Sequence, residues 1–166
     1  MPAPLDPACM FRVLAEHEVK YVLIGGLAAV LHGSPAMTND VDIVPEHDDE
    51  NLARLSDALR SLDARLRAES DPDGIAFDPH PALLAQMAIA NLTTRCGDLD
   101  LTFAPAGLQG YAELVGAAVV FEIEGHAVQV AALHHIIQSK EAADRPRDRA
   151  VLPILYALRE EIGDDS

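Results

Sequence analysis

The stretch "VLIGGLAAVLHGSPAMTNDVDI", residues Val22–Ile43, decides the fold. An apolar run ends at Gly25 and Gly26, and two acids follow later, one residue apart. A continuous apolar run that stops at glycine is typical of a buried strand. The segment 27–33 has the pattern of a short helix closed by glycine. The stretch therefore predicts a strand that ends at the glycine pair, then a short helix, a loop and a second strand.

The two acids of this stretch, Asp40 and Asp42, lie in the apolar segment "DVDIV". Side chains two residues apart on a strand share a face, so both carboxylates project together. Like charges side by side are costly to bury unless a cation or hydrogen-bond donors satisfy them. Asp98 and Asp100 repeat this Asp-x-Asp pattern in a second apolar segment, "DLDLTF". If the two strands are neighbours, three or four carboxylates converge, and such hard oxygen ligands suit Mg²⁺ or Mn²⁺.

An alternative without metal binding stays open for these acids. In an unrelated α/β domain they are solvated, and the two Asp-x-Asp segments project from opposite faces of the sheet.

The glycine pair provides a second half of a candidate site. Backbone amides at the start of a helix can hold a phosphate, and Gly25 and Gly26 would let that phosphate approach the main chain. A phosphate cradle beside a carboxylate metal site is the equipment for phosphoryl or nucleotidyl transfer. An ordinary tight turn is the alternative for the glycines.

Positive charge gathers late in the chain. Lys140, one of two lysines, ends an apolar stripe at helical spacing in "LHHIIQSK". A lysine there needs an anionic partner or must extend to solvent. Arg145, Arg147 and Arg149 follow closely. This segment suits a triphosphate tail or an RNA backbone, although pairing with surface acids would also explain Lys140.

The order of elements predicts an α/β (α+β) domain, a small mixed sheet with flanking helices. We expect one domain over residues 1–166, with the segment 145–162 forming a carboxy-terminal helix that packs on it. Pro153 is tolerated there if it falls in the first turn of the helix. The remaining elements are expected as helices over 6–18, 48–62, 132–143 and 148–161, strands over 88–94 and 98–103, a hairpin about Gly125 over 119–131, and a loop over 68–80.

Composition excludes several classes of protein. The 166 residues are 49% hydrophobic, so disorder is not expected, and the formal net charge of −15 argues against a broad surface for DNA or RNA. We see no signal peptide and no apolar run long enough for a membrane span, and we expect a cytoplasmic protein. Cys9 and Cys96 lack metal-ligand or redox spacing, so free thiols are expected.

The segments "GG", "HGSPAMTNDVDI", "GDLDLTF" and "SKEAADRPRD" together resemble the nucleotidyltransferase superfamily, which shares the palm fold of DNA polymerase beta. More narrowly, they resemble its bacterial branch of abortive-infection (AbiEii-like) toxins. The resemblance spans about residues 20–160.

The resemblance implies roles for individual residues. Asp40 and Asp42 would bind metal, and Asp100 would be the third carboxylate, binding metal or activating the incoming hydroxyl. Gly25 and Gly26 would approach the nucleotide phosphates. Matches to the downstream lysine and aspartate motifs are Lys140 and Asp148, which would contact phosphate and orient the site, although Asp148 could instead only cap the last helix. Thr38 and Arg145 complete the predicted nucleotide-binding set.

The implied activity is metal-dependent transfer of a nucleoside monophosphate from a nucleoside triphosphate to a hydroxyl acceptor. A tRNA end or a protein hydroxyl would accept it, with a cognate toxin or antitoxin as partner. Two departures support an alternative, a catalytically weakened nucleotide- or partner-binding module. Leu27 stands where many members carry serine, and Ala36 where many relatives of this branch carry arginine, so two phosphate contacts are lost.

Overall fold

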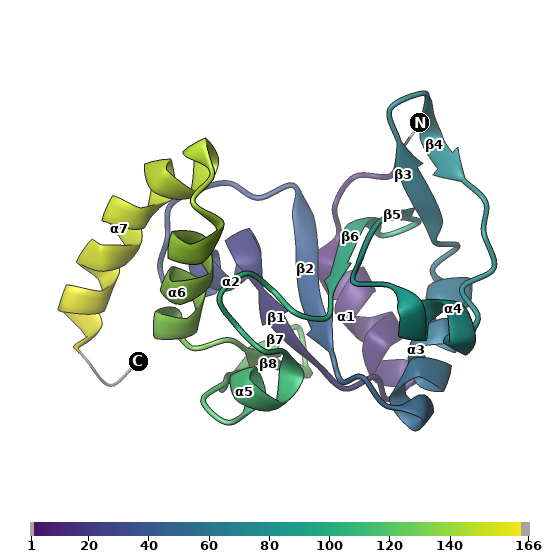
Figure 1. Ribbon diagram of the computed structural model, residues 1–166, viewed down its shortest axis with the longest axis horizontal. Coiled ribbons are helices and arrows are strands. Elements are labelled where there is room, and N and C mark those ends of the chain that lie inside the picture. The colour runs from purple at the N-terminus through teal and green to yellow at the C-terminus, as the bar shows by residue number, and fades with distance from the viewer. Residues whose placement is uncertain (1, 164–166) are drawn as a thin grey trace.

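A computed structural model of the chain describes residues 2–163, which form one eight-stranded mixed sheet with helices packed around it (Figure 1). The strand order is β4-β3-β5-β6-β2-β1-β8-β7. The strands are β1 (Tyr21–Ile24), β2 (Asp40–Pro45), β3 (Arg65–Ala68), β4 (Asp71–Ile75), β5 (Ile89–Thr94), β6 (Gly97–Thr102), β7 (Val119–Ile123) and β8 (His126–Val130). The helices are α1 (Pro7–Glu16), α2 (Gly25–Leu31), α3 (Asp49–Ser61), α4 (Pro81–Gln86), α5 (Tyr111–Val115), α6 (Leu133–Ala143) and α7 (Pro146–Ile162).

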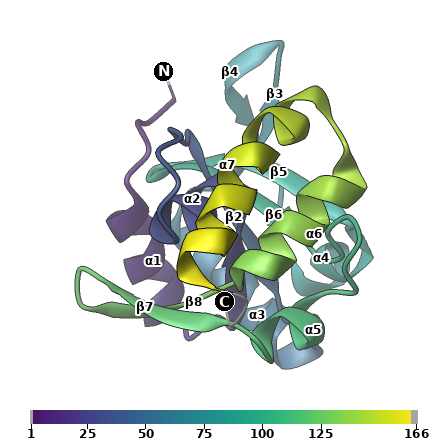
Figure 2. The same cartoon turned by 90° about the vertical axis from the view of Figure 1, so that its left-hand side faces the viewer.

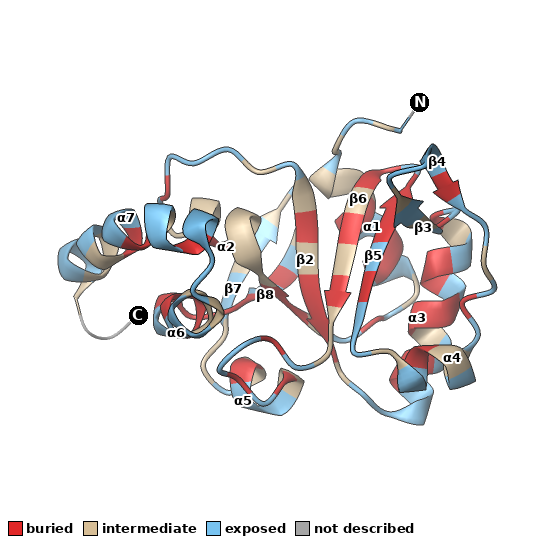
Figure 3. Ribbon diagram, turned by 45° about the horizontal axis from the view of Figure 1, so that its top comes forward, coloured by how far each residue is buried: buried red, intermediate tan, exposed pale blue. Residues whose placement is uncertain are grey.

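The pairing of three central strands positions the acidic residues. β1 and β2 are antiparallel, with Ile24 opposite Asp42. β2 and β6 are parallel, with Asp42 opposite Asp100. Burial alternates along β2 and β6, as the red and tan bands of Figure 3 show, because apolar side chains point into the core and acids point away from it. The fully buried members of this set are Val41, Ile43, Leu99 and Leu101.

Helices α1 and α3 pack together and cover the apolar face of the sheet. Phe11 of α1 stacks on Tyr21 of β1, with ring centroids 6.5 Å apart. The helical spacing of the leucines between 52 and 62 predicts one buried stripe, and Leu52, Leu55 and Leu59 are indeed almost wholly buried. This layer leaves the opposite face of β2 and β6 for the carboxylates.

Helices α6 and α7 pack against each other, and α6 also contacts α2 (Figure 1). The prediction for Pro153 is wrong, because α7 begins at Pro146 and Pro153 lies inside the helix. A proline there removes one hydrogen bond of the helix, and the partly exposed position of α7 at the surface lets water satisfy the freed carbonyl. The helix begins earlier than predicted because Pro146 suits the first helical position.

The predicted loop over residues 68–80 is also wrong. β3 and β4 pair as an antiparallel hairpin at one end of the sheet. Its outer strand "DPDGI" is rich in turn-forming residues and is mostly exposed, so it lacks the alternation by which a half-buried strand is recognised. The short helices α4 and α5 were not predicted either, because each is shorter than a periodic pattern needs.

Cys9 and Cys96 form a disulfide, which corrects the expectation of free thiols. The two residues are 87 positions apart in sequence, so spacing gave no sign that they meet. The fold brings them together because the segment before α1 lies on the turn between β5 and β6, where the Asp6 amide donates to the Cys96 carbonyl at 2.9 Å. The expected cytoplasmic location remains a prediction, and the disulfide weighs against it because disulfides seldom persist in reducing compartments.

Within residues 2–163, no helix combines the length and the apolar character needed to cross a membrane.

Asn51 joins three elements and provides a test of this architecture. Its side chain is 1% exposed, accepts from the Lys20 amide at 2.7 Å, and donates to the carbonyls of Lys20 at 2.9 Å and Glu46 at 2.8 Å. We expect Asn51→Ala to lower the free energy of unfolding by about 2–3 kcal/mol, because buried backbone groups lose their partners. Urea denaturation measures this loss. Arg54→Ala, which removes an exposed ion pair from the same helix, should change it by less than about 0.5 kcal/mol.

Candidate active site

Three carboxylates converge on the face of the sheet opposite the core. Asp40, Asp42 and Asp100 each offer an oxygen, and these oxygens all lie within 4.8 Å of one another. The parallel register of β2 and β6 causes this convergence, since it places Asp42 directly beside Asp100 and Asp40 beside Asp98. The two Asp-x-Asp segments therefore share one face, contrary to the alternative of solvated acids on opposite faces.

Asp98 lies outside this group although it is on the same face. Its carboxylate is 3.5 Å from the Arg67 guanidinium. The structure thus brings Asp100, and not Asp98, together with the first pair of acids.

The electrostatics of the cluster favour a cation. Burial, followed by the charges of Asp40 and Asp100, raises the pKa of Asp42 to about 8. Burial and the charge of Asp100 also raise the pKa of Asp40. Three half-buried carboxylates that cannot all ionise comfortably form a donor set that fits a hard divalent cation, which would replace the retained proton.

Gly25 is required by the packing of the cluster against α2. Its φ of +76° lies in the left-handed region, and a Cβ there would collide with the Asp42 carboxylate. A Cβ on Gly26 would lie 3.0 Å from the Thr38 hydroxyl, which donates to the Asp40 carbonyl at 3.1 Å. The glycine pair, Thr38 and the carboxylates therefore form one continuous surface.

The two positions that depart from the pattern of the resembled superfamily contribute no polar side chain to this surface. Leu27 packs against the hydrophobic core. Ala36 interacts through its backbone amide, which donates to the Ser34 hydroxyl at 3.3 Å.

A second charged group lies at the junction of α6 and α7. The Asp148 carboxylate is 1% exposed and accepts from Arg145, from the side chain at 2.6 Å and from the backbone amide at 3.1 Å. Lys140 Nζ is 3.7 Å from Asp148 Oδ1. Burial opposes ionisation of Asp148, but the Arg145 hydrogen bonds and the Lys140 charge outweigh it and lower the pKa of Asp148. Asp148 therefore caps α7 and also fixes both cations in place.

This cationic group faces the carboxylate cluster. The Lys140 charge is near enough to Asp42 to oppose the rise in its pKa. The Asp42 charge in turn contributes to the raised pKa of Arg145, although hydrogen bonding to Asp148 is the larger cause. Four elements distant in sequence thus meet at one place: the start of α2, β2, β6 and the α6–α7 junction.

Arg67 of β3 also reaches the cluster, and the sequence analysis missed it. Its guanidinium donates to Asp100 Oδ1 at 2.6 Å and to the Leu92 carbonyl at 3.0 Å. The alternation of "RLRA" carries the signal of a strand with both arginines on one face. This alternation does not predict β3 from sequence, because only four residues carry it and turn-forming residues follow directly.

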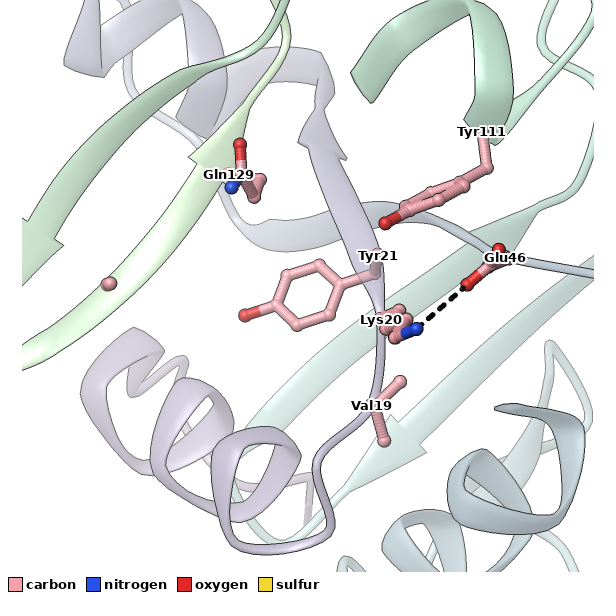
Figure 4. Close-up of a pocket in the computed structure, with 7 residues that line it drawn as sticks. Val19, Lys20, Tyr21, Glu46, Tyr111 and Gln129 are labelled. Atoms are coloured by element: carbon pink, nitrogen blue, oxygen red, sulfur yellow. Dashed lines mark ion pairs between the residues drawn. The ribbon is translucent and has the colours of Figure 1, made fainter. Parts of the chain in front are cut away.

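A cavity of about 330 Å³ lies elsewhere in the molecule (Figure 4). Lys20, Tyr21, Glu46, Tyr111 and Gln129 contribute to its lining, and Lys20 Nζ is 3.9 Å from Glu46 Oε2. Lys20 and Tyr21 lie at the start of β1 and Glu46 follows β2, so the cavity is at the opposite strand ends from the carboxylate cluster. The cavity is therefore separate from the candidate active site.

No protein-family model matches the chain, and no curated protein is significantly similar to it in sequence. Solved structures do match. A candidate nucleotidyltransferase from Thermotoga maritima is 15% identical, with a TM-score of 0.56, over 93% of this chain and 96% of that one. The antibiotic-resistance factor ANT(2'')-Ia, an aminoglycoside nucleotidyltransferase, is 16% identical, with a TM-score of 0.54, over 96% of this chain and 83% of that one.

The chain has a nucleotidyltransferase-like fold. The likeness extends over nearly the whole length of both chains in the first comparison, which confirms the predicted fold class. At 15–16% identity it establishes the fold alone. The chemistry depends on the residues of the site.

The raised pKa of Asp42 predicts a pH-dependent stability in the metal-free protein. The folded state keeps a proton that the unfolded chain releases near the ordinary value of 3.8, so the associated stability is complete below about pH 4 and is lost as the pH rises towards about 8. We expect thermal melting in a chelator to show this decline, with a smaller decline in Asp42→Asn. Equal declines in the two proteins would contradict the assignment.

Arg67 competes with a cation for Asp100, which gives a second prediction. Removing its charge should tighten Mn²⁺ binding about tenfold, because a positive charge beside a metal site repels the ion. Calorimetric titration of Arg67→Ala measures this change. Arg65→Ala is the matched control, since Arg65 donates to the carbonyls of Asp73 and Gly74 and should leave the affinity unchanged. Weaker binding by Arg67→Ala would refute the competition.

Proposed function

We propose that the protein is a metal-dependent nucleotidyltransferase that moves a nucleoside monophosphate from a nucleoside triphosphate to a hydroxyl acceptor. One observation carries this proposal: three carboxylates within 4.8 Å lie beside a glycine pair and face a group of fixed cations. Such a combination suits a ligand that bears both a divalent ion and a phosphate chain. The fold, which two nucleotidyltransferase-like structures share, supports it.

Asp40, Asp42 and Asp100 would hold Mg²⁺ or Mn²⁺. When bound, the ion supplies neutralising charge to the phosphate oxygens and aligns the reacting groups. Asp100 has a further role as proton acceptor. Its carboxylate takes the proton of the acceptor hydroxyl while that oxygen bonds to the α-phosphorus and the bond to pyrophosphate breaks.

The nucleotide phosphates would lie along Gly25 and Gly26. A side chain at either glycine would collide with Asp42 or crowd Thr38, so glycine keeps the first amides of α2 close to the carboxylates, where a phosphate would meet both. Thr38 adds a hydroxyl at the border of the same surface. Lys140 and Arg145 offer positive charge to the phosphate tail, which becomes the pyrophosphate leaving group. Asp148 does not touch the nucleotide in this scheme but holds both cations in position.

We further propose an anionic acceptor, a tRNA end, as in the toxin branch that the sequence resembles. Arg145, Arg147 and Arg149 concentrate positive charge at the start of α7, on a chain whose formal net charge is −15. A nucleic-acid backbone that approaches this end of the molecule would find its most favourable contacts there. A role in a toxin–antitoxin pair, with a cognate protein partner, follows from the same resemblance.

A protein hydroxyl is the competing acceptor, and a catalytically weakened binding module is the competing function. Leu27 and Ala36 favour the latter, because neither supplies the polar side chain that many members of the resembled superfamily carry at these positions. A weakened module keeps the affinity for nucleotide and metal but releases no pyrophosphate.

Incubation with each of four labelled nucleoside triphosphates, Mn²⁺, and either total tRNA or total protein tests the activity directly. We expect label to transfer to tRNA in a metal-dependent way, and Asp42→Asn to lower the rate at least about a thousandfold, because a metal ligand is lost. Transfer of label to protein would show that the acceptor is a protein hydroxyl and not tRNA, while the nucleotidyl transfer itself would stand.

Calorimetry with the same nucleotides separates the remaining outcomes. Nucleotide binding without release of pyrophosphate would favour the weakened module. Neither binding nor transfer, with Asp42→Asn behaving like the unaltered protein, would remove the proposal.

A further inference from the structure

The two outer strands of the sheet, β4 and β7, differ sharply in how they are protected. An outer strand presents unpaired backbone groups, and proteins usually protect such an edge with proline, charge or a bulge. β4, "DPDGI", has all three: Pro72, two aspartates, and a register shift in its pairing with β3. β7, "VVFEI", has no proline, a single charge and a regular register with β8 over all five residues.

β7 also exposes two adjacent apolar side chains, beside the exposed Glu122. Val119 is 40% exposed and Val120 is 56% exposed. Figure 2 shows the β7–β8 hairpin extending along the lower border of the molecule, beyond the helices α6 and α7. An apolar, regular and exposed outer strand is suited to accept another strand.

The hairpin turn determines which backbone groups of β7 face outwards. Glu124 and Gly125 both have positive φ, of 47° and 85°, as in a two-residue turn of the primed kind. Such a turn closes on a hydrogen-bonded pair, here Ile123 and His126. By alternation, the amides and carbonyls of Val120 and Glu122 point away from β8, towards solvent.

We propose that β7 pairs antiparallel with β7 of a second copy, about a twofold axis through Phe121, and so joins the two sheets into one. The sequence of the strand is complementary to itself in this register. Val119 lies opposite Ile123, Phe121 lies opposite Phe121, and Val120 lies opposite Glu122, so no like charges meet. The outward backbone groups of Val120 and Glu122 also come opposite each other, as an antiparallel ladder requires.

This pairing makes opposite predictions for two substitutions at one exposed position. Val120→Glu would place a carboxylate beside the Glu122 carboxylate of the second copy, twice per dimer. Val120→Lys would place an ammonium there instead. We expect the first to weaken the dimer about tenfold or more and the second to keep or tighten it, because cross-strand charge pairs act in these directions.

Sedimentation equilibrium measures the outcome, with Ile75→Glu and Ile75→Lys as controls on the opposite edge, where Ile75 is 51% exposed. The unaltered chain and both controls should reach twice the 17.8 kDa mass of one chain, Val120→Glu should dissociate, and Val120→Lys should not. Circular dichroism checks that each variant is folded. A monomer at all concentrations up to about 100 μM, a dimer untouched by Val120→Glu, or dissociation by both Val120 variants would overturn the proposal.

Amide hydrogen exchange of the unaltered protein gives an answer that needs no variant. The amides of Val120 and Glu122 should exchange slowly in concentrated solution and quickly on dilution. Fast exchange at every concentration would also overturn the pairing. Neither measurement depends on the nucleotidyltransferase activity, so this inference and the proposed function stand or fail separately.

Discussion

The parallel pairing of β2 with β6 is the constraint on which the candidate site depends. It brings the acids of two segments, about sixty residues apart in sequence, onto one face and into contact distance of one cation. Mutual repulsion of three half-buried carboxylates opposes folding. The free energy gained by burying the apolar residues between them, on the other face of the strands, offsets this cost. The strand order therefore creates a strongly negative potential at one position, which favours a bound cation.

Cationic side chains around the site offset part of this negative charge. Lys140 and Arg145 face the acids but are fixed by Asp148, and Arg67 contacts only Asp100 among the three acids of the cluster, besides pairing with Asp98. None of these three cations contacts all three acids, and a divalent ion bound by Asp40, Asp42 and Asp100 together would supply the missing positive charge. The buried Asp148 thus has a structural and an electrostatic role. It caps the start of α7, and it holds Lys140 and Arg145 in position near the site.

Much of this arrangement was predictable from the sequence, because its residues occur in short patterns with a physical meaning. The glycine pair after an apolar run and the two Asp-x-Asp strands specified local geometry, and the lysine at the end of a helical stripe pointed to an anionic neighbour. Arg67 was not predictable in the same way, since its contact with Asp100 crosses β5 and depends on the order of strands. The Cys9–Cys96 disulfide was not predictable for the same reason. The hairpin of β3 and β4 was not predictable because an exposed, proline-containing outer strand carries no hydrophobic alternation.

The central claim is that Asp40, Asp42 and Asp100 share one divalent ion. Crystals grown with Mn²⁺ and a nonhydrolysable nucleoside triphosphate test it most directly, because manganese is located by its anomalous scattering. The account predicts an anomalous peak bounded by all three carboxylates, with the phosphate chain running past Gly25 and Gly26 towards Lys140. A peak elsewhere, or nucleotide bound with no ion between the three acids, would contradict it.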